Sequence, residues 1–426
     1  MPSGPDAARA SIEAVWRLES ARIVGALTRL VRDVGLAEEL AQDALVVALQ
    51  EWPVNGVPPN PAGWLMTTAR HRAIDRLRRE DRLAVKIAEI GRSAEDDQRT
   101  HGAADFDAVL DDDALLKDDV LRLIFVACHP VLSTEARIAL TLRVVGGLTT
   151  DEIARAFVVP EATVAQRIVR AKRTLADKRI AFEIPPPAER AARLASVLEV
   201  IYLIFNEGYT ATAGSDWLRP ELTHEALRLG RVLAELASDE PEVHGLVALM
   251  EIQSSRNAAR VGPDGAPVPL LEQNRGRWDG LLIRRGYAAL LRAEALGKPV
   301  GPYVLQAAIA ACHARARTAA DTDWAAIAAL YGSLARLTPT PVVELNRAVA
   351  VAMAYGPERG LEIVDAVAAD PALRDYHLLP TVRGDLLARL GRTDDARAEF
   401  ERAAALTRNE RERAVLQSRA AALAEG

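Results

Sequence analysis

Beyond Pro187 the chain is an almost unbroken succession of amphipathic helical patterns, and this periodicity limits the fold more than any other feature. The clearest stretch has Leu386, Leu387 and Leu390 in one helix and Ala396 and Phe400 in the next. Alanine, leucine and arginine dominate, and aromatic residues make up only 4% of the chain, which disfavours a β-sandwich or barrel. The pattern therefore predicts an all-α fold whose C-terminal part is an α-solenoid-like array of helical hairpins.

This array is tetratricopeptide-like rather than a strict repeat, because its period is loose. A weaker copy of the hairpin occupies residues 342–367, and residues 303–335 resemble another. The run Ile184-Pro185-Pro186-Pro187 precedes the array and breaks any helix, so it marks a domain boundary. With 426 residues the chain is also too long for one domain of ~100–200 residues, which predicts several domains.

The net charge of the chain is −6, yet basic residues are concentrated in two blocks. Residues 64–80 hold five arginines and two acids, for a local charge of +3. Residues 137–179 hold nine basic and four acidic residues, for +5, and residues 95–119 between the blocks carry −8. Phosphate binding depends on local basic density, so the blocks are either nucleic-acid-binding helices or solvated helix faces.

The N-terminal third reads as helices separated by breakers. Residues 11–52 have two helical patterns, and four prolines and a glycine at residues 53–61 predict a loop. A helix follows over residues 64–79, and Leu65, Ala69, Ala73 and Leu77 form its expected buried stripe. Its other side then exposes most of the first basic block.

The second basic block has the pattern of a helix-turn-helix. Gly146-Gly147 ends one helix, Thr149 or Thr150 can cap the next, and Pro160 lies in a turn. The helix over residues 161–175 then has a stripe spaced at +4, +7 and +11, formed by Val164, Ile168, Ala171 and Leu175.

These patterns together predict an order of domains. They are a disordered tail over residues 1–10, a helical domain over 11–81, an acidic flexible linker over 82–114, a helix-turn-helix domain over 115–182, a proline-rich boundary over 183–188 and the tetratricopeptide-like helical domain over 189–426.

Three segments resemble bacterial sigma factors of the extracytoplasmic-function (ECF) type. Residues 37–45, AEELAQDAL, resemble the part of sigma region 2 that binds core RNA polymerase. Residues 64–79 resemble the helix that recognises and melts the minus-ten element, and residues 147–173 resemble region 4, which reads the minus-thirty-five element. The long tail, with YLIFNEGY at residues 202–209, resembles the ECF subgroup that carries a C-terminal tetratricopeptide-like extension. Ala165 departs from the pattern, because many relatives have lysine there.

The resemblance implies three sets of binding residues. Core RNA polymerase would be contacted by Glu38, Glu39, Gln42 and Asp43. The opened minus-ten strand would be held by Asn55, Asn60, Trp64, Thr67, His71, Arg72, Arg76 and Arg79. The minus-thirty-five duplex would be read by Thr163, Gln166, Arg167, Arg170 and Arg173.

Several of these assignments have a structural alternative. A tryptophan at a helix start is more often a core residue than a stacking platform for a base, so Trp64 has two interpretations. Of Gln166, Arg167, Arg170 and Arg173, one or two are expected to be merely solvated, and some to touch only phosphates. The acidic segment from Asp105 to Asp119 either mimics RNA in a polymerase channel or is a soluble spacer.

No motif indicates catalysis, a cofactor or a metal centre, so the chain is expected not to be an enzyme. The pairs Cys128-His129 and Cys312-His313 lack a second ligand pair at zinc spacing. Two cysteines, no secretion signal and no apolar run of ~20 residues predict a cytoplasmic protein that does not enter the membrane.

The predicted function is a sigma factor that directs promoter-specific initiation, with promoter DNA and core RNA polymerase as partners. The tail is expected to regulate it, either by an intramolecular contact or through a regulatory protein. One alternative is a helix-turn-helix activator with a tetratricopeptide-like sensor, which does not replace sigma. Another is an interaction scaffold with no role at DNA, which the two basic blocks disfavour.

Overall fold

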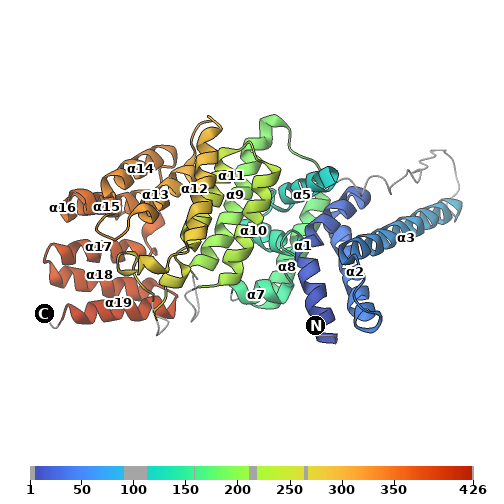
Figure 1. Ribbon diagram of the computed structural model, residues 1–426, viewed down its shortest axis with the longest axis horizontal. Helices are drawn as coiled ribbons and strands as arrows, with labels where there is room; N and C mark the ends of the chain where they lie inside the picture. The colour runs from blue at the N-terminus through green and yellow to red at the C-terminus, as the bar shows by residue number, and fades with distance from the viewer. Residues whose placement is uncertain (1–4, 91–112, 158, 211–217, 263–266, 425–426) are drawn as a thin grey trace. The chain divides into compact units, whose positions relative to one another are not determined.

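The computed structural model describes residues 5–90, 113–157, 159–210, 218–262 and 267–424. These ranges hold 18 α-helices and four short 3-10 helices, and an isolated β-bridge joins Val261 and Pro267 (Figure 1). The predicted all-α fold is therefore confirmed. None of the helices in these ranges is both long and apolar enough to cross a lipid bilayer. The chain divides into two compact units, residues 1–201 and residues 202–426.

The first unit contains seven helices and the beginning of an eighth among its described residues. They are α1 (Pro5–Val31), α2 (Val34–Asn55), α3 (Pro61–Ile90), α5 (Asp113–Ala127), α6 (Thr134–Val144), α7 (Thr150–Phe157), α8 (Glu161–Asp177) and the first part of α9 (Pro187–Tyr209).

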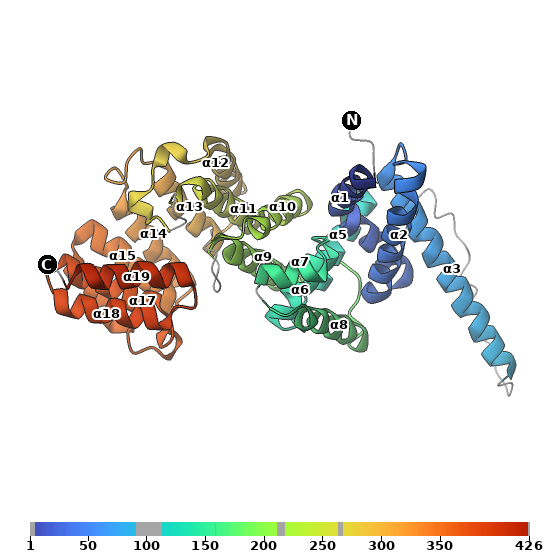
Figure 2. The ribbon, with the colours of Figure 1, turned by 90° about the horizontal axis from the view of Figure 1, so that it is seen from below.

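Helices α1, α2 and α3 pack against one another in the first unit (Figure 2). Asp33 caps α2 by accepting a hydrogen bond from the Leu36 backbone N–H at 2.8 Å. The buried stripe of α2 is built largely from alanine, with Ala37, Ala41, Ala44 and Ala48 fully buried. Alanine has a short side chain, so the stripe lets neighbouring helices approach closely.

The expected stripe of α3 is confirmed at Leu65, Ala69 and Ala73, while Leu77 is half-buried. The predicted loop over residues 53–61 is shorter in the structure. Helix α2 continues through Pro53 to Asn55 and ends at Gly56, which has a φ of 86° and donates its N–H to the Trp52 carbonyl.

The helix-turn-helix prediction agrees with the geometry of α7 and α8. Thr149 and Glu152 form a reciprocal capping box, with Glu152 N–H donating to Thr149 Oγ1 at 3.2 Å and Thr149 N–H donating to Glu152 Oε2 at 2.8 Å. All four members of the expected α8 stripe, Val164, Ile168, Ala171 and Leu175, are buried. This stripe fixes which side of α8 faces outward.

The domain limits differ from the expected ones at four places. Helix α1 begins at Pro5, inside the expected tail, and α3 extends to Ile90, inside the expected linker. Helix α5 includes the last two residues of that linker. The central part of the linker, residues 91–112, lies outside the described residues. The division between the units falls after Ile201 rather than in the proline-rich segment.

Hydrogen bonds explain why the first part of α9 belongs to the first unit. The Ser196 hydroxyl donates to the Cys128 carbonyl and accepts from Arg137, both at 2.6 Å. Arg193 donates to the Phe125 carbonyl at 2.8 Å. These contacts join α9 to the end of α5 and to α6, and no sequence period reveals them.

The second unit is a succession of helices, most of which pack on their neighbours in sequence. After the end of α9 come α10 (Pro220–Leu236), α11 (Pro241–Ser254), three short 3-10 helices, α12 (Gly280–Ala295), α13 (Pro302–Arg315), α14 (Trp324–Leu337), α15 (Pro341–Tyr355), α16 (Pro357–Val367), a fourth 3-10 helix, α17 (Leu378–Arg389), α18 (Thr393–Leu406) and α19 (Glu410–Ala422).

The hairpin of α17 and α18 has the predicted packing, and α19 lies beside it (Figure 1). Leu386, Leu387, Ala396 and Phe400 are all buried in one cluster. Helices α15 and α16 form the second expected hairpin.

Gly360→Ala is expected to destabilise the second unit by about 1–3 kcal/mol, because no space exists for a side chain. A Cβ there would lie 2.5 Å from the Ala352 Cβ and 2.8 Å from the Ala348 carbonyl oxygen. Gly332→Ala in α14 is the matched control. A Cβ at Gly332 meets no atom within 4 Å, so helix propensity alone should stabilise by ~0.5–1 kcal/mol. Urea unfolding followed by circular dichroism measures both, and shifts of equal sign would contradict this explanation.

Candidate nucleic-acid interface

The outward face of α8 carries polar and basic side chains at helical spacing. The predicted duplex-reading residues divide into an exposed set and a half-buried set: Gln166, Arg170 and Arg173 in the first, Thr163 and Arg167 in the second. Arginine and glutamine can form paired hydrogen bonds with guanine and adenine edges, so the exposed set is chemically suited to a major groove.

Sequence reasoning did not single out Val169, which lies on the same helix and is 64% exposed. An exposed apolar side chain can contact a thymine methyl group, although single exposed apolar residues are also common on solvated faces. The sequence could have placed Val169 on the outward face, because it lies off the buried stripe and three positions after Gln166.

The start of α3 holds the residues predicted for the opened strand. Asn60 caps α3, since its Oδ1 accepts the Gly63 N–H at 3.0 Å, while Asn55 is exposed at the end of α2. The Trp64 ring packs edge-on against Trp52, with ring centroids 5.5 Å apart and an interplanar angle of 71°. Trp52 is fully buried and Trp64 is half-buried, so Trp64 contributes to the core and keeps part of its surface accessible.

A groove of about 540 Å³ lies between α2 and α3. Residues predicted to bind polymerase and residues predicted to bind the minus-ten strand both line it. Glu39 and Asp43 line it from α2, and His71, Arg72, Arg76 and Arg79 line it from α3. Arg72 and Asp43 form an exposed ion pair at 3.5 Å across it. Thr67 is exposed outside the groove, and Gln42 is half-buried on α2. The groove therefore has two acidic side chains from α2 and, from α3, three arginines, His71 and the acid Asp75.

Glu38 differs from its predicted neighbours, because only 5% of it is exposed. Its carboxylate accepts from Arg143 Nε at 2.8 Å and from Lys172 Nζ at 2.6 Å. Arg143 belongs to α6 and Lys172 to α8, so this carboxylate connects the region of α2 to the helix-turn-helix. Glu38 is thus buried in this arrangement, whereas Glu39 and Asp43 are exposed. The pairing is long-range, and the sequence pattern gave no sign of it.

Asp119 makes a second buried connection within the first unit. It is fully buried on α5 and forms ion pairs with Arg29 of α1 at 3.1 Å and with Arg122 at 2.8 Å. Burial raises the pKa of this carboxyl, and the two arginines oppose that effect. Asp119 is the last residue of the acidic segment that was expected either to mimic RNA in a polymerase channel or to be a soluble spacer. The structure places it on α5, fully buried, while residues 105–112 of that segment lie outside the described residues.

The two cysteines of the cysteine-histidine pairs, Cys128 and Cys312, are free thiols. The Cys128 thiol is buried 3.3 Å from the Thr141 hydroxyl, and burial raises its pKa to about 11. Within the described ranges, no group of three or more histidine, cysteine or acidic side chains is arranged to hold a metal ion.

Comparisons with known proteins agree with this geometry. The Sigma-70 region 2 family matches residues 16–83, and the Sigma-70 region 4 family matches residues 122–175. An ECF RNA polymerase sigma factor SigK from Mycolicibacterium vanbaalenii is 32% identical over 152 residues, which span 35% of this chain and 71% of that protein. The chain belongs to the ECF RNA polymerase sigma factors. Such sigma factors serve transcription initiation.

The C-terminal part of the sigma factor has relatives without an assigned role. A family of unknown function, DUF6596, matches residues 193–294. An uncharacterised protein of Rhizobium meliloti (strain 1021) is 44% identical over 393 residues, covering 92% of the sigma factor and 91% of that protein. The similarity therefore extends well beyond regions 2 and 4. No solved structure matches the sigma factor.

Glu38→Gln is expected to destabilise the first unit by about 1.5–3 kcal/mol, since Arg143 and Lys172 each lose a charged acceptor. Glu39→Gln is the control, because the neighbouring carboxylate is exposed. Thermal unfolding by calorimetry measures the difference, and an equal effect of the two substitutions would contradict the assigned role of Glu38.

Proposed function

We propose that the sigma factor binds core RNA polymerase in the cytoplasm and directs promoter-specific initiation. In this proposal α3 and the preceding loop bind the minus-ten element, and α8 reads the minus-thirty-five element. The observation that carries the proposal is the face of α8, where Gln166, Arg170 and Arg173 are exposed opposite a fully buried stripe. A helix anchored by one buried apolar stripe presents its other side in a fixed orientation. Recognition of a DNA sequence requires such a fixed orientation.

Core polymerase is proposed to bind the exposed part of α2, through Glu39, Gln42 and Asp43. Asp43 and Glu39 lie on the groove whose α3 wall holds three arginines beside Asp75, so polymerase binding and strand binding would occur on adjacent surfaces. Glu38 would join this surface only after separating from Arg143 and Lys172. Loss of those ion pairs would also release α8 from α2.

The C-terminal helical region is proposed to modulate this activity, as the tail of an ECF subgroup. Support comes from α9, whose first part is bonded to α5 and α6 through Ser196 and Arg193. A change in the second unit that alters α9 would reach the helix-turn-helix through these hydrogen bonds. The regulatory input, from a partner protein or from within the chain, would act on the same helix.

Replacing Arg170 and Arg173 together by alanine is expected to weaken promoter binding by about 1–3 kcal/mol for each base that is no longer read. The slope of log affinity against log salt should fall by about one for each arginine that no longer neutralises a phosphate. Run-off transcription with core polymerase and anisotropy on promoter DNA measure the two effects.

The control for that experiment is Arg397→Ala, which removes a partly exposed arginine paired with Asp394 on α18. Full activity of the double variant would refute duplex reading by α8. Specific initiation must also depend on adding this protein to core enzyme. An activator that does not replace sigma would give no transcript under those conditions.

A chain ending at Ile201 is expected to differ from the full chain in specific transcription by about fivefold or more, in either direction. This cut keeps the α9 contacts with Cys128 and Phe125, whereas a chain ending at Pro186 removes them. The shorter chain should therefore unfold at a lower temperature, which separates loss of stability from loss of regulation. Equal transcription by the full chain and the chain ending at Ile201 would contradict modulation by the tail.

A further inference from the structure

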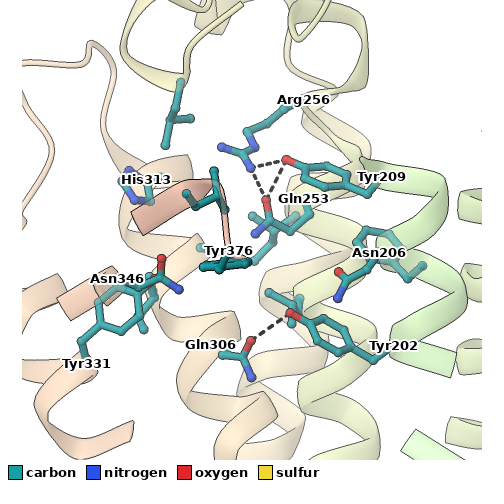
Figure 3. A pocket seen from close by; sticks show the side chains of 17 residues that line it. Tyr202, Asn206, Tyr209, Gln253, Arg256, Gln306, His313, Tyr331, Asn346 and Tyr376 are labelled. Carbon is teal, nitrogen blue, oxygen red and sulfur yellow. Dashed lines mark hydrogen bonds between the residues drawn. The ribbon is translucent and has the colours of Figure 1, made fainter. Parts of the chain in front are cut away.

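The second unit encloses a cavity of about 440 Å³, between α9, α11, α13, α14, α15 and the segment before α17 (Figure 3). Its size lies within the range of small-molecule sites. Four tyrosines contribute to its wall, Tyr202, Tyr209, Tyr331 and Tyr376. The remaining polar lining consists of amides, one histidine and one arginine, and no aspartate or glutamate of the described residues lines the cavity.

The arginine of this cavity, Arg256, is a buried cation. It is 9% exposed and donates to the Tyr209 hydroxyl and to the Gln253 side-chain oxygen (Figure 3). Its guanidinium also lies 5.7 Å from the centroid of the Tyr209 ring and 5.8 Å from that of Trp278. All these partners are neutral, and the Arg256 Nε has no hydrogen-bond acceptor within the described part of the chain.

Two further arginines, Arg260 and Arg275, lie close enough to interact electrostatically with Arg256, and Asp321 partly offsets the charge of Arg275. Burial lowers the pKa of His313 to about 4, and the charges of Arg256 and Arg275 act in the same direction, so the imidazole is neutral at pH 7. Arg275 donates to the His313 and Ala316 carbonyls. Arg260 stacks over Tyr209 with its guanidinium 3.4 Å from the ring centroid. Among the residues that the structure describes, no carboxylate forms an ion pair with Arg256.

A buried guanidinium without an anionic partner is unfavourable, and a bound anion would remove that cost. Arginine binds carboxylates through two parallel hydrogen bonds. The tyrosine rings beside it favour edge-on or offset contact with a further ring, as Tyr202 and Tyr303 already show with centroids 5.4 Å apart. Amide side chains such as Asn346 and Gln306 can bond polar substituents.

We propose that this cavity binds a small aromatic carboxylate, with the carboxylate on Arg256 and the ring among the tyrosines. The site is a ligand-binding site of the second unit. It does not depend on the proposed promoter recognition, because the described residues that line it all fall within 202–378.

Isothermal titration of the full chain with benzoate tests the proposal, and benzamide serves as the neutral isostere. Benzoate is expected to bind one site per chain with a Kd of about 1 mM or lower, and benzamide about tenfold more weakly or worse. Inorganic phosphate is titrated in parallel to separate an organic anion from a bare one.

Asn346→Asp changes the charge of the cavity without changing side-chain size, and it should weaken benzoate binding by about tenfold. Gln417→Glu, at an exposed position of α19, adds the same charge outside the cavity and should leave the affinity unchanged. Arg256→Gln should abolish binding. Since this variant removes a buried residue, its thermal unfolding is measured beside it, and Asn346→Asp decides the matter if Arg256→Gln unfolds.

Binding of benzoate that is weakened in Asn346→Asp and kept in Gln417→Glu supports the proposal. Three results would overturn it: no benzoate binding up to about 10 mM, equal binding of benzamide, or equal affinity of Asn346→Asp and the unmodified chain. Binding of phosphate without benzoate would overturn it as well, because the rings would then have no role.

Discussion

Close helix approach through small side chains is the constraint on which both units of this protein depend. In the first unit, the α2 stripe places Ala37, Ala41, Ala44 and Ala48 where other helices carry leucine, and all four are fully buried. In the second unit, Gly360 lies directly against Ala352, with no space for a side chain. A helix of this kind gains little from any single large residue and depends on the fit along its whole length.

The buried charges of the two units differ in their partners. Within the first unit, Glu38 is paired with Arg143 and Lys172, and Asp119 is paired with Arg29 and Arg122. Removing one member of such a pair leaves an uncompensated charge, so these residues hold the helices of regions 2 and 4 in one arrangement. In the second unit, Arg256 has only neutral partners among the described residues. This contrast is the reason for proposing a ligand there.

Our proposals for the two units rest on different physical evidence. For regions 2 and 4, family membership and an exposed basic face on α8 support promoter binding, and three arginines of α3 line the groove beside it. For the C-terminal region, similarity reaches only a family of unknown function and an uncharacterised relative, so a cavity and an uncompensated charge carry the inference. An aromatic acid in that cavity would be a direct chemical input to the second unit.

Local pattern in the sequence determined much of this protein. The helical periods predicted the buried residues of α8, most of those in α3 and the hairpin of α17 and α18, and the local sequence offered Thr149 or Thr150 as a helix cap, because these depend on neighbours within a few turns. Tertiary structure alone decided that Glu38 is hidden between two cations, that Asp119 lies in a core and that the first part of α9 belongs with α5 and α6. It also decided that four tyrosines and Arg256 meet at one cavity. Each of these depends on residues tens to more than a hundred positions apart, whose proximity no period along the chain encodes.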